Sequence, residues 1–491
     1  MILNARPQVG KKGFIQIWVG IFYVDNSERA EGPTLAFKLN EQPTVPENGE
    51  LHPIRDSKTR GDHQPLNYQG VFQFKQLATP DPVRLHITAN NKGIELIVPP
   101  FPTKVPAKLE GTFNLLLSSC YFQPEDKGLL GYIVKDLRIK PDMTVLAGDQ
   151  VYLDLPLFED LPEDAEGLAQ AFGTKYERNW ISDELNIPGL QKVLKMAPTV
   201  CIPDDHELFN NAPVGQAQLP GTHLPAARAR WIKAATGLYE DYQQGGPPGS
   251  AGTSYRVDIE PMYMLFLDTR MARSSDFDSP TGLMSASTVK QLEEWEQALM
   301  SAKANHQSCV GVLSGGQALF VDTPNALDER VADAEYSNFK QFRIIQDTLD
   351  RLATLRIPVV YLTGDVHWSR VAQATHRASG LKLLTEVICS PSCLMRTPWV
   401  DRSKELINSV KNWLGPDDAW PRHSPPEPAH GWFGANSEFS PVPGPPLNKG
   451  DYVAMLQFCT TGQVVEMTIT FFSINAQRRA TQVGPFALLS Y

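Results

Sequence analysis

Short clusters of carboxylate, amide, phenol and imidazole side chains recur along this chain, and each follows an apolar run. The segment Gly148–Tyr152 places a carboxylate and a phenol three residues apart, and Asp204–Glu207 packs three carboxylates and an imidazole into four residues. Gly364–His367 offers a carboxylate and an imidazole two residues apart, which lie on one side of an extended segment. Asn210–Asn211 adds two amide oxygens, and Cys120 adds a thiol. Proteins build metal sites from side chains of these types.

Carboxylates that share a pocket repel each other and raise each other's pKa, so a cluster of this kind needs positive charge. Bound cations supply it, and oxygen-rich ligands suit hard ions such as Ca²⁺ or Mn²⁺. The anionic forms of Tyr152 and Cys120 are strong donors that suit a ferric ion. We therefore expect Fe³⁺ together with Ca²⁺, with Mn²⁺ or Zn²⁺ as alternatives. Each motif alone also fits a turn or a capped strand end, and their joint occurrence after apolar strands favours the metal site.

The apolar runs before these clusters predict the strands that position them. Strands alternate with helical patterns, which favours an α/β fold, and ligands of such folds bind beyond the carboxyl ends of the strands. The predicted strands are Phe113–Leu117, Met143–Ala147, Thr199–Ile202, Met262–Leu267, Cys309–Leu313 and Pro358–Leu362. The predicted helices are Leu129–Leu137, Ser287–Ala302 and Arg343–Ala353.

The two ends of the chain have a different pattern. Short runs rich in β-branched and aromatic residues alternate with turn-formers before the Pro-rich stretch Pro99–Pro106, which predicts a small β-sandwich. We place this domain at residues 1–108 and the catalytic domain at residues 109–491. Near the end, Tyr452–Phe458 and Val464–Phe472 predict a β-hairpin, and Pro421–Pro446 is too rich in proline for regular structure and predicts a long loop.

Composition narrows the classes of function. The formal net charge of −10 and the pI of about 5.6 argue against nucleic acid or an anionic membrane surface as partner, since both need a basic face. A small phosphorylated substrate remains compatible, because local metal ions can override the net charge. The six cysteines form no CxxC pair, and no apolar run reaches the ~20 residues of a transmembrane helix. We expect a cytoplasmic protein, or an exported, periplasmic one if a signal was removed.

Five motifs follow one another along the chain: Ser118-Ser119-Cys120, Gly148–Tyr152, Asp204–Asn211, Leu267–Arg270 and Gly364–Arg370. In this order they resemble the motifs of the alkaline phosphatase D (PhoD-like) family of the calcineurin-like metallophosphoesterases. The resemblance covers roughly residues 112–475. It implies an α/β fold with a four-layer αββα core, metal ions at the edges of the sheets, and a small N-terminal β-sandwich.

The resemblance also implies roles for single residues. Asp149 would bridge the metal ions, and His206 would face the substrate phosphate. Asp205 would be a metal ligand that also belongs to the catalytic residues. The complete set of implied metal ligands is Cys120, Asp149, Tyr152, Asp205, Asn211, Asp365 and His367.

The expected reaction is hydrolysis of phosphate monoesters or diesters by a metal-activated hydroxide, on a small-molecule or lipid substrate. Arg270 and Arg370 are candidates for pairing with the phosphate, and a structural salt bridge is an equal alternative for each. The competing hypothesis is a non-catalytic, partner-binding protein whose metal site is only structural.

Overall fold

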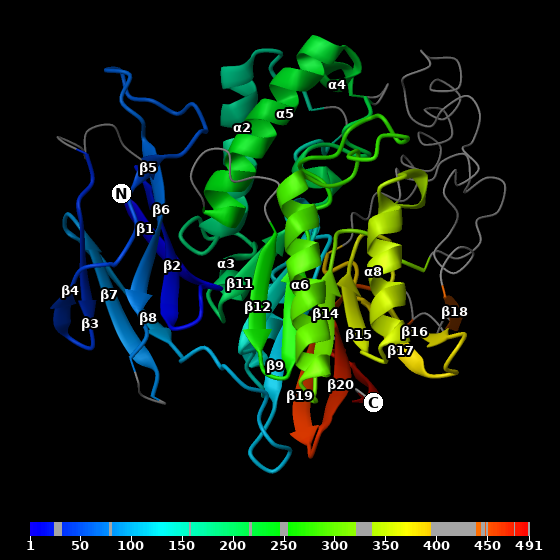
Figure 1. Ribbon diagram of the computed structural model, residues 1–491. Helices are drawn as coiled ribbons and strands as arrows, with labels where there is room; N and C mark the ends of the chain where they lie inside the picture. Colours follow the sequence, from blue (N-terminus) through cyan, green and yellow to red (C-terminus); the bar gives the residue numbers. More distant parts are fainter. Residues whose placement is uncertain are drawn as a thin grey trace.

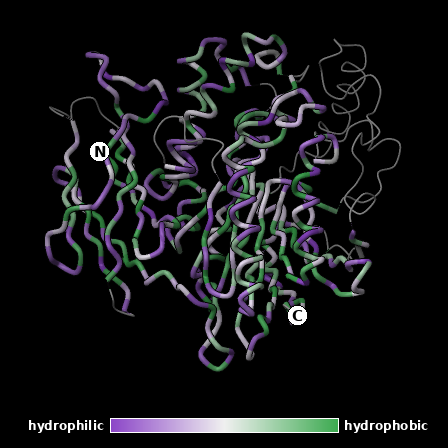
Figure 2. Tube along the Cα trace, in the orientation of Figure 1, coloured by the Kyte–Doolittle hydropathy of each residue, from purple (hydrophilic) through white to green (hydrophobic). Residues whose placement is uncertain are grey.

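The apolar runs form the inner strands of two stacked sheets, which confirms the predicted α/β class (Figure 1). The computed structural model describes the chain except for residues 24–31, 78–80, 157–158, 216–218, 246–253, 321–335, 394–437, 443–446, 448–449, 476 and 490–491. Figure 2 shows hydrophobic stretches along the inner strands. Among the described residues, none of the helices combines the length and the apolar character needed to cross a bilayer.

The first sheet has ten strands in the described part of the chain. Strands β9, β10 and β11 lie next to each other and run parallel, so their carboxyl ends meet at one edge. The predicted C-terminal hairpin is confirmed as β19 and β20, and it pairs with β9. In sheet order the strands are β21 (Ala480–Leu488), β20 (Val464–Ser473), β19 (Tyr452–Thr461), β9 (Phe113–Ser118), β10 (Met143–Ala147), β11 (Thr199–Ile202), β1 (Ile2–Gln8), β2 (Phe14–Phe22), β6 (Asn67–Lys75) and β5 (His52–Pro53).

The second sheet carries the other predicted strand ends, and its strands β13, β14 and β15 are parallel. The loop predicted for Pro421–Pro446 is wrong at Phe439–Val442, which pairs with β16 as an edge strand that tolerates proline. Residues 421–437 and 443–446 lie outside the described residues. In sheet order the strands are β12 (Tyr255–Ile259), β13 (Met262–Phe266), β14 (Val310–Ser314), β15 (Val359–Thr363), β17 (Lys382–Ile388), β16 (Arg370–His376) and β18 (Phe439–Val442).

Helices cover both outer faces, which completes the four-layer αββα core. Successive side chains of a strand point to opposite faces, so Leu115 and Leu117 of β9 pack between the sheets, whereas Leu116 packs against helices. The helices on the first sheet are α1 (Leu129–Asp136), α2 (Ala165–Trp180), α3 (Gln191–Leu194), α4 (Pro220–His223) and α5 (Pro225–Tyr239). Those on the second sheet are α6 (Ala286–Ala304) and α8 (Phe342–Thr354). Short 3₁₀ helices are η2 (Gln123–Glu125), η3 (Asp205–Glu207) and η5 (Tyr336–Asn338), and η4 (Glu240–Gln244) is a π-helical turn.

The N-terminal strands continue the first sheet. Strand β1, which the sequence did not predict, pairs in parallel with β11 where Gln8 lies opposite Thr199. A third sheet packs on β1, β2 and β6 around a separate apolar core. The boundary at residue 108 stays a prediction. The third sheet contains, in order, β4 (Gln42–Thr44), β3 (Leu35–Leu39), β7 (Val83–Ala89) and β8 (Lys92–Val98).

Candidate metal centre

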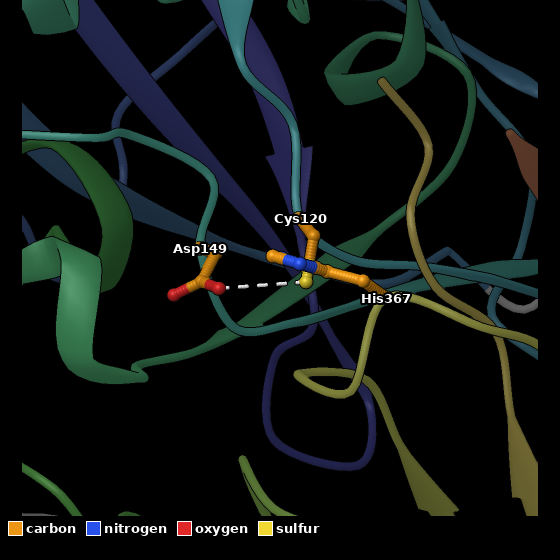
Figure 3. A group of neighbouring side chains, drawn as sticks. All are labelled: Cys120, Asp149 and His367. Atoms are coloured by element: carbon orange, nitrogen blue, oxygen red, sulfur yellow. Dashed lines mark hydrogen bonds between the residues drawn. The ribbon is translucent and has the colours of Figure 1, made fainter. Parts of the chain in front are cut away.

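Side chains from both stacked sheets meet at the carboxyl ends of their parallel strands. Cys120 follows β9, Asp149 follows β10, and His367 follows β15 of the other sheet. In Figure 3 these three side chains point toward one another. The Cys120 Sγ atom lies 3.4 Å from Asp149 Oδ2. Residues that are far apart in the chain therefore face one small volume.

Three overlapping groups in the described part of the chain could each hold a metal ion, and Asp149 belongs to all three. In each group the potential ligand atoms lie within 4.8 Å of one another. Asp204 and His206 enter these groups although neither was predicted as a ligand; the sequence signal for Asp204 is its place in the same acidic run. The groups are Cys120, Asp149 and His367; Asp149, Asp205 and His206; and Asp149, Asp204, Asp205 and Asp365.

Five of the seven predicted metal ligands have left-handed backbone conformations. Residues other than glycine rarely adopt positive φ, and such conformations cost on the order of 1–3 kcal/mol each unless the surrounding structure enforces them. Strain of this kind gathers at functional sites, so its placement here supports a functional site. The residues are Cys120 (φ 51°), Asp149 (φ 58°), Asn211 (φ 60°), Asp365 (φ 62°) and His367 (φ 55°).

The buried carboxylate of Glu207 holds the loops after β10 and β11 together. Its Oε2 accepts the backbone N–H groups of Asp149 at 3.0 Å and Asp204 at 2.8 Å. Its Oε1 accepts those of Gln150 at 2.6 Å and Val151 at 3.3 Å. Burial raises the pKa of Glu207 to about 7, although these hydrogen bonds favour the ionised form. One side chain thus fixes the backbone on both sides of the cluster.

Two glycines allow these loops to approach closely. Gly148 has φ 92°, and a Cβ atom there would lie 2.6 Å from the Cβ atom of Asp204. A Cβ atom at Gly364 would clash with Ser119 and lie 2.7 Å from the carbonyl oxygen of Ala147. Each Gly-Asp pair therefore brings its aspartate to the point where neighbouring strand ends touch.

Burial disfavours the anionic forms of three predicted ligands in the cluster. Burial raises the pKa of Asp149, Cys120 and Tyr152 well above the ordinary values, and the carboxylate of Asp149 raises those of Cys120 and Tyr152 further. Oδ2 of Asp204 is a buried atom without a hydrogen-bond partner among the described residues. Buried thiol, phenol and carboxylates around one point fit a cation cluster, since bound cations would stabilise the ionised forms.

His206 lies beside the cluster and is fixed by two contacts. Its ring packs on that of Tyr152 with the centroids 4.1 Å apart, and its Nδ1 lies 2.7 Å from Asp154 Oδ1. Burial acts to lower the pKa of His206, but the nearby carboxylates, first that of Asp154, outweigh burial and raise the pKa well above its ordinary value. Asp154 was not predicted, and its only signal is a lone carboxylate in the apolar stretch Val151–Leu155.

Asp205 and Asn211, two further predicted ligands, are buried in the loop after β11. The backbone N–H of Asn211 donates to Asp205 Oδ2 at 2.7 Å, which closes the loop after β11. Ser390, which was not predicted, donates from its Oγ to the Sγ of Cys120 at 3.1 Å and accepts the backbone N–H of His367 at 3.2 Å. Ser390 therefore ties the two sheets together at the cluster.

Both predicted arginines lie in buried ion pairs, which is the alternative that the sequence left open. Nε of Arg270 donates to Asp204 Oδ1 at 2.8 Å, and its Nη1 donates to a backbone carbonyl at 3.0 Å. Nη2 of Arg370 lies 3.3 Å from Glu386 Oε2. The guanidinium of Arg270 balances the charge of Asp204, and Arg370 pairs with Glu386 of the second sheet.

The fold has a known counterpart. No family model and no curated protein matches the sequence. A solved structure described as the structure of PhoD matches with a TM-score of 0.57 at 12% sequence identity. The match covers 98% of this chain and 88% of that chain. At this identity the match concerns the fold, and it agrees with the resemblance that the motifs indicate. The chain has the fold of PhoD over nearly its whole length.

Proposed function

We propose that this chain is a PhoD-like metal-dependent hydrolase of phosphate monoesters or diesters. The observation that carries the proposal is the convergence of three potential metal-binding groups on Asp149. A cluster of closely spaced cations suits phosphoryl transfer, because such cations clamp the oxygens around phosphorus. The matching fold and the five motifs in the expected order support the same chemistry.

Seven predicted side chains would hold the cations. We propose that the thiol and the phenol take Fe³⁺ and that the oxygen-rich remainder takes Ca²⁺ or a similar hard ion. The side chains are Cys120, Asp149, Tyr152, Asp205, Asn211, Asp365 and His367, and Asp204 adds an eighth. When bound, such ions activate water and neutralise the negative charge of a phosphoryl group.

Three other polar side chains of the predicted site have separate roles in the proposal. Asp154 and its neighbours keep a proton on His206, whose ring is held against Tyr152, so His206 can protonate the oxygen that leaves phosphorus. Arg270 is committed to Asp204, and we assign it to charge balance within the cluster. Arg370 is committed to Glu386, and we assign it to the structure of the second sheet.

Turnover of p-nitrophenyl phosphate and bis-p-nitrophenyl phosphate by metal-loaded protein tests the proposal and separates monoester from diester preference. Asp149→Asn should abolish turnover, because it removes the negative charge of the one carboxylate that is common to all three groups. Asp142→Asn, at the opposite end of β10, is the matched control and should retain activity. Protein that takes up metal but releases no nitrophenolate from either ester would refute the hydrolase and favour a structural metal site.

A further inference from the structure

The turn η4 (Glu240–Gln244) continues α5 and is entirely buried. The last carbonyl groups of a helix lack partners within the helix and must find them elsewhere. Here side chains of β1 and β2 provide most of those partners. Trp18 Nε1 donates to the carbonyl of Asp241 at 2.8 Å, Arg6 Nη2 to that of Tyr242 at 2.7 Å, and Gln8 Nε2 to that of Gln244 at 3.1 Å.

The acidic side chains of η4 are held by the N-terminal part of the chain as well. Arg55 lies between β5 and β6, and its Nη1 pairs with Glu240 Oε2 at 2.5 Å. Its Nη2 pairs with Asp241 Oδ1 at 2.8 Å. Gln69 of β6 donates a hydrogen bond to the same oxygen of Asp241 at 3.3 Å. Both the backbone and the charged side chains of η4 therefore depend on the N-terminal strands for their partners.

One side chain of η4 contacts Glu207, the residue that holds the loops of the metal centre together. Gln243 Nε2 donates to Oε1 of Glu207 at 3.2 Å. Oε1 is the oxygen that accepts the N–H groups of Gln150 and Val151 after β10. A single chain of contacts thus runs from β1 through η4 and Gln243 to Glu207, and from there to the loops that carry the predicted ligands.

We propose that Gln243 is a positioning residue of the metal centre and that the N-terminal strands are an integral part of that centre because they hold Gln243 in place. The proposal rests on the metal cluster of the proposed function. Without the amide of Gln243, Oε1 of Glu207 would lose one of its three hydrogen bonds, and the carboxylate that joins the loops after β10 and β11 would be held less firmly. Partners of this kind, which orient the groups around a metal, change metal affinity when they are removed.

Gln243→Met tests the proposal, since methionine has a similar length and no donor. The neighbouring Gln244→Met is the matched control, because the side-chain amide of Gln244 is buried in the same turn with no hydrogen-bond partner among the described residues. Metal-stripped proteins are titrated with Mn²⁺, and the free ion is followed by electron paramagnetic resonance. We expect Gln243→Met to bind Mn²⁺ about 10-fold more weakly than wild type, the low end of the range for groups that contact a ligand directly, because Gln243 acts through Glu207. Gln244→Met should bind as wild type does.

Two further variants extend the test along the contact chain. Gln243→Asn keeps an amide that is too short to reach Glu207, and it should show the same loss if Gln243→Met does not fold. Arg6→Met should weaken Mn²⁺ binding in the same direction. Unfolding midpoints in chelator, where no metal is bound, show whether each variant is folded.

The outcomes separate the two proposals. Wild-type protein that binds none of Mn²⁺, Fe³⁺ and Ca²⁺ would end the proposed function and this inference together. If wild type binds Mn²⁺ but Gln243→Met and Gln243→Asn bind it equally well, the inference is wrong while the proposed function stands. An equal loss in Gln244→Met would also overturn it, because the effect would then belong to the turn and not to the contact with Glu207.

Discussion

Asp56 is a fully buried carboxylate between β5 and β6, where the N-terminal strands contact α2. Its Oδ2 accepts from Asn67 Nδ2 at 2.6 Å, and its Oδ1 accepts the backbone N–H of Lys58 at 3.1 Å. Burial raises its pKa from 3.8 to about 6, although both hydrogen bonds act in the opposite direction. The stability of the protein should therefore depend on pH through this group.

The sign follows from the raised pKa of the folded state. Protonated Asp56 favours folding below the unfolded pKa of 3.8, and this contribution is lost as pH rises through about 6. A shift from 3.8 to about 6 corresponds to roughly 3 kcal/mol at about 1.4 kcal/mol per pKa unit. Asp56→Asn removes the ionised form but also one of two acceptors, a loss of about 1 kcal/mol. The variant should be about 2 kcal/mol more stable than wild type near pH ~8 and slightly less stable near pH ~4.

Urea denaturation of wild type and Asp56→Asn across this pH range measures the difference in the free energy of unfolding. Asp160→Asn, which changes an exposed carboxylate, is the control and should follow wild type throughout. A difference between Asp56→Asn and wild type that does not change with pH would refute the reasoning, because the buried ionised form would then carry no penalty.

Three more predictions concern the cluster. Gly364→Ala should destabilise the protein by roughly 1–3 kcal/mol and weaken metal binding, because its Cβ atom would overlap the neighbouring strand ends. The control Gly61→Ala, whose Cβ atom would have nothing within 4 Å, should change neither stability nor metal binding. Thermal unfolding measures the stability, and metal titration measures the binding. Arg270→Met leaves the charge of Asp204 buried and unpaired, so metal-free protein should lose about 3–5 kcal/mol in urea denaturation, and added metal should restore part of the loss. Tyr152→Phe should remove any visible tyrosinate-to-iron absorption band of the iron-loaded protein and leave its circular dichroism unchanged; a band that persists would exclude Tyr152 as the ligand.

Strands that are apolar on both faces were predictable. β10 and β11 were predicted with the bounds that the structure shows, since every residue of each is buried. Both sheet faces are covered, by the other sheet on one side and by helices on the other, so both faces of these strands are mostly apolar, with one threonine in each strand. The polar clusters after these strands were visible for the same reason, because they end an uninterrupted apolar run.

Strand β1 was not predictable in this way. It carries Asn4, Arg6 and Gln8, three polar side chains that local patterning assigns to a surface. In the structure they are buried, and their partners are carbonyls of α2 and η4 far along the chain. A buried polar group is stable only with such partners, and local sequence carries no record of them.

The sequence by itself determined which residue types end the inner strands, because an apolar strand and its polar end are local features. Tertiary structure alone decided that Asp149 is common to three groups, that Arg270 is bound to Asp204, and that Gln243 reaches Glu207. Distances between side chains depend on how two sheets stack and on which loops touch. That stacking results from burial summed over the whole molecule, and not from any single segment.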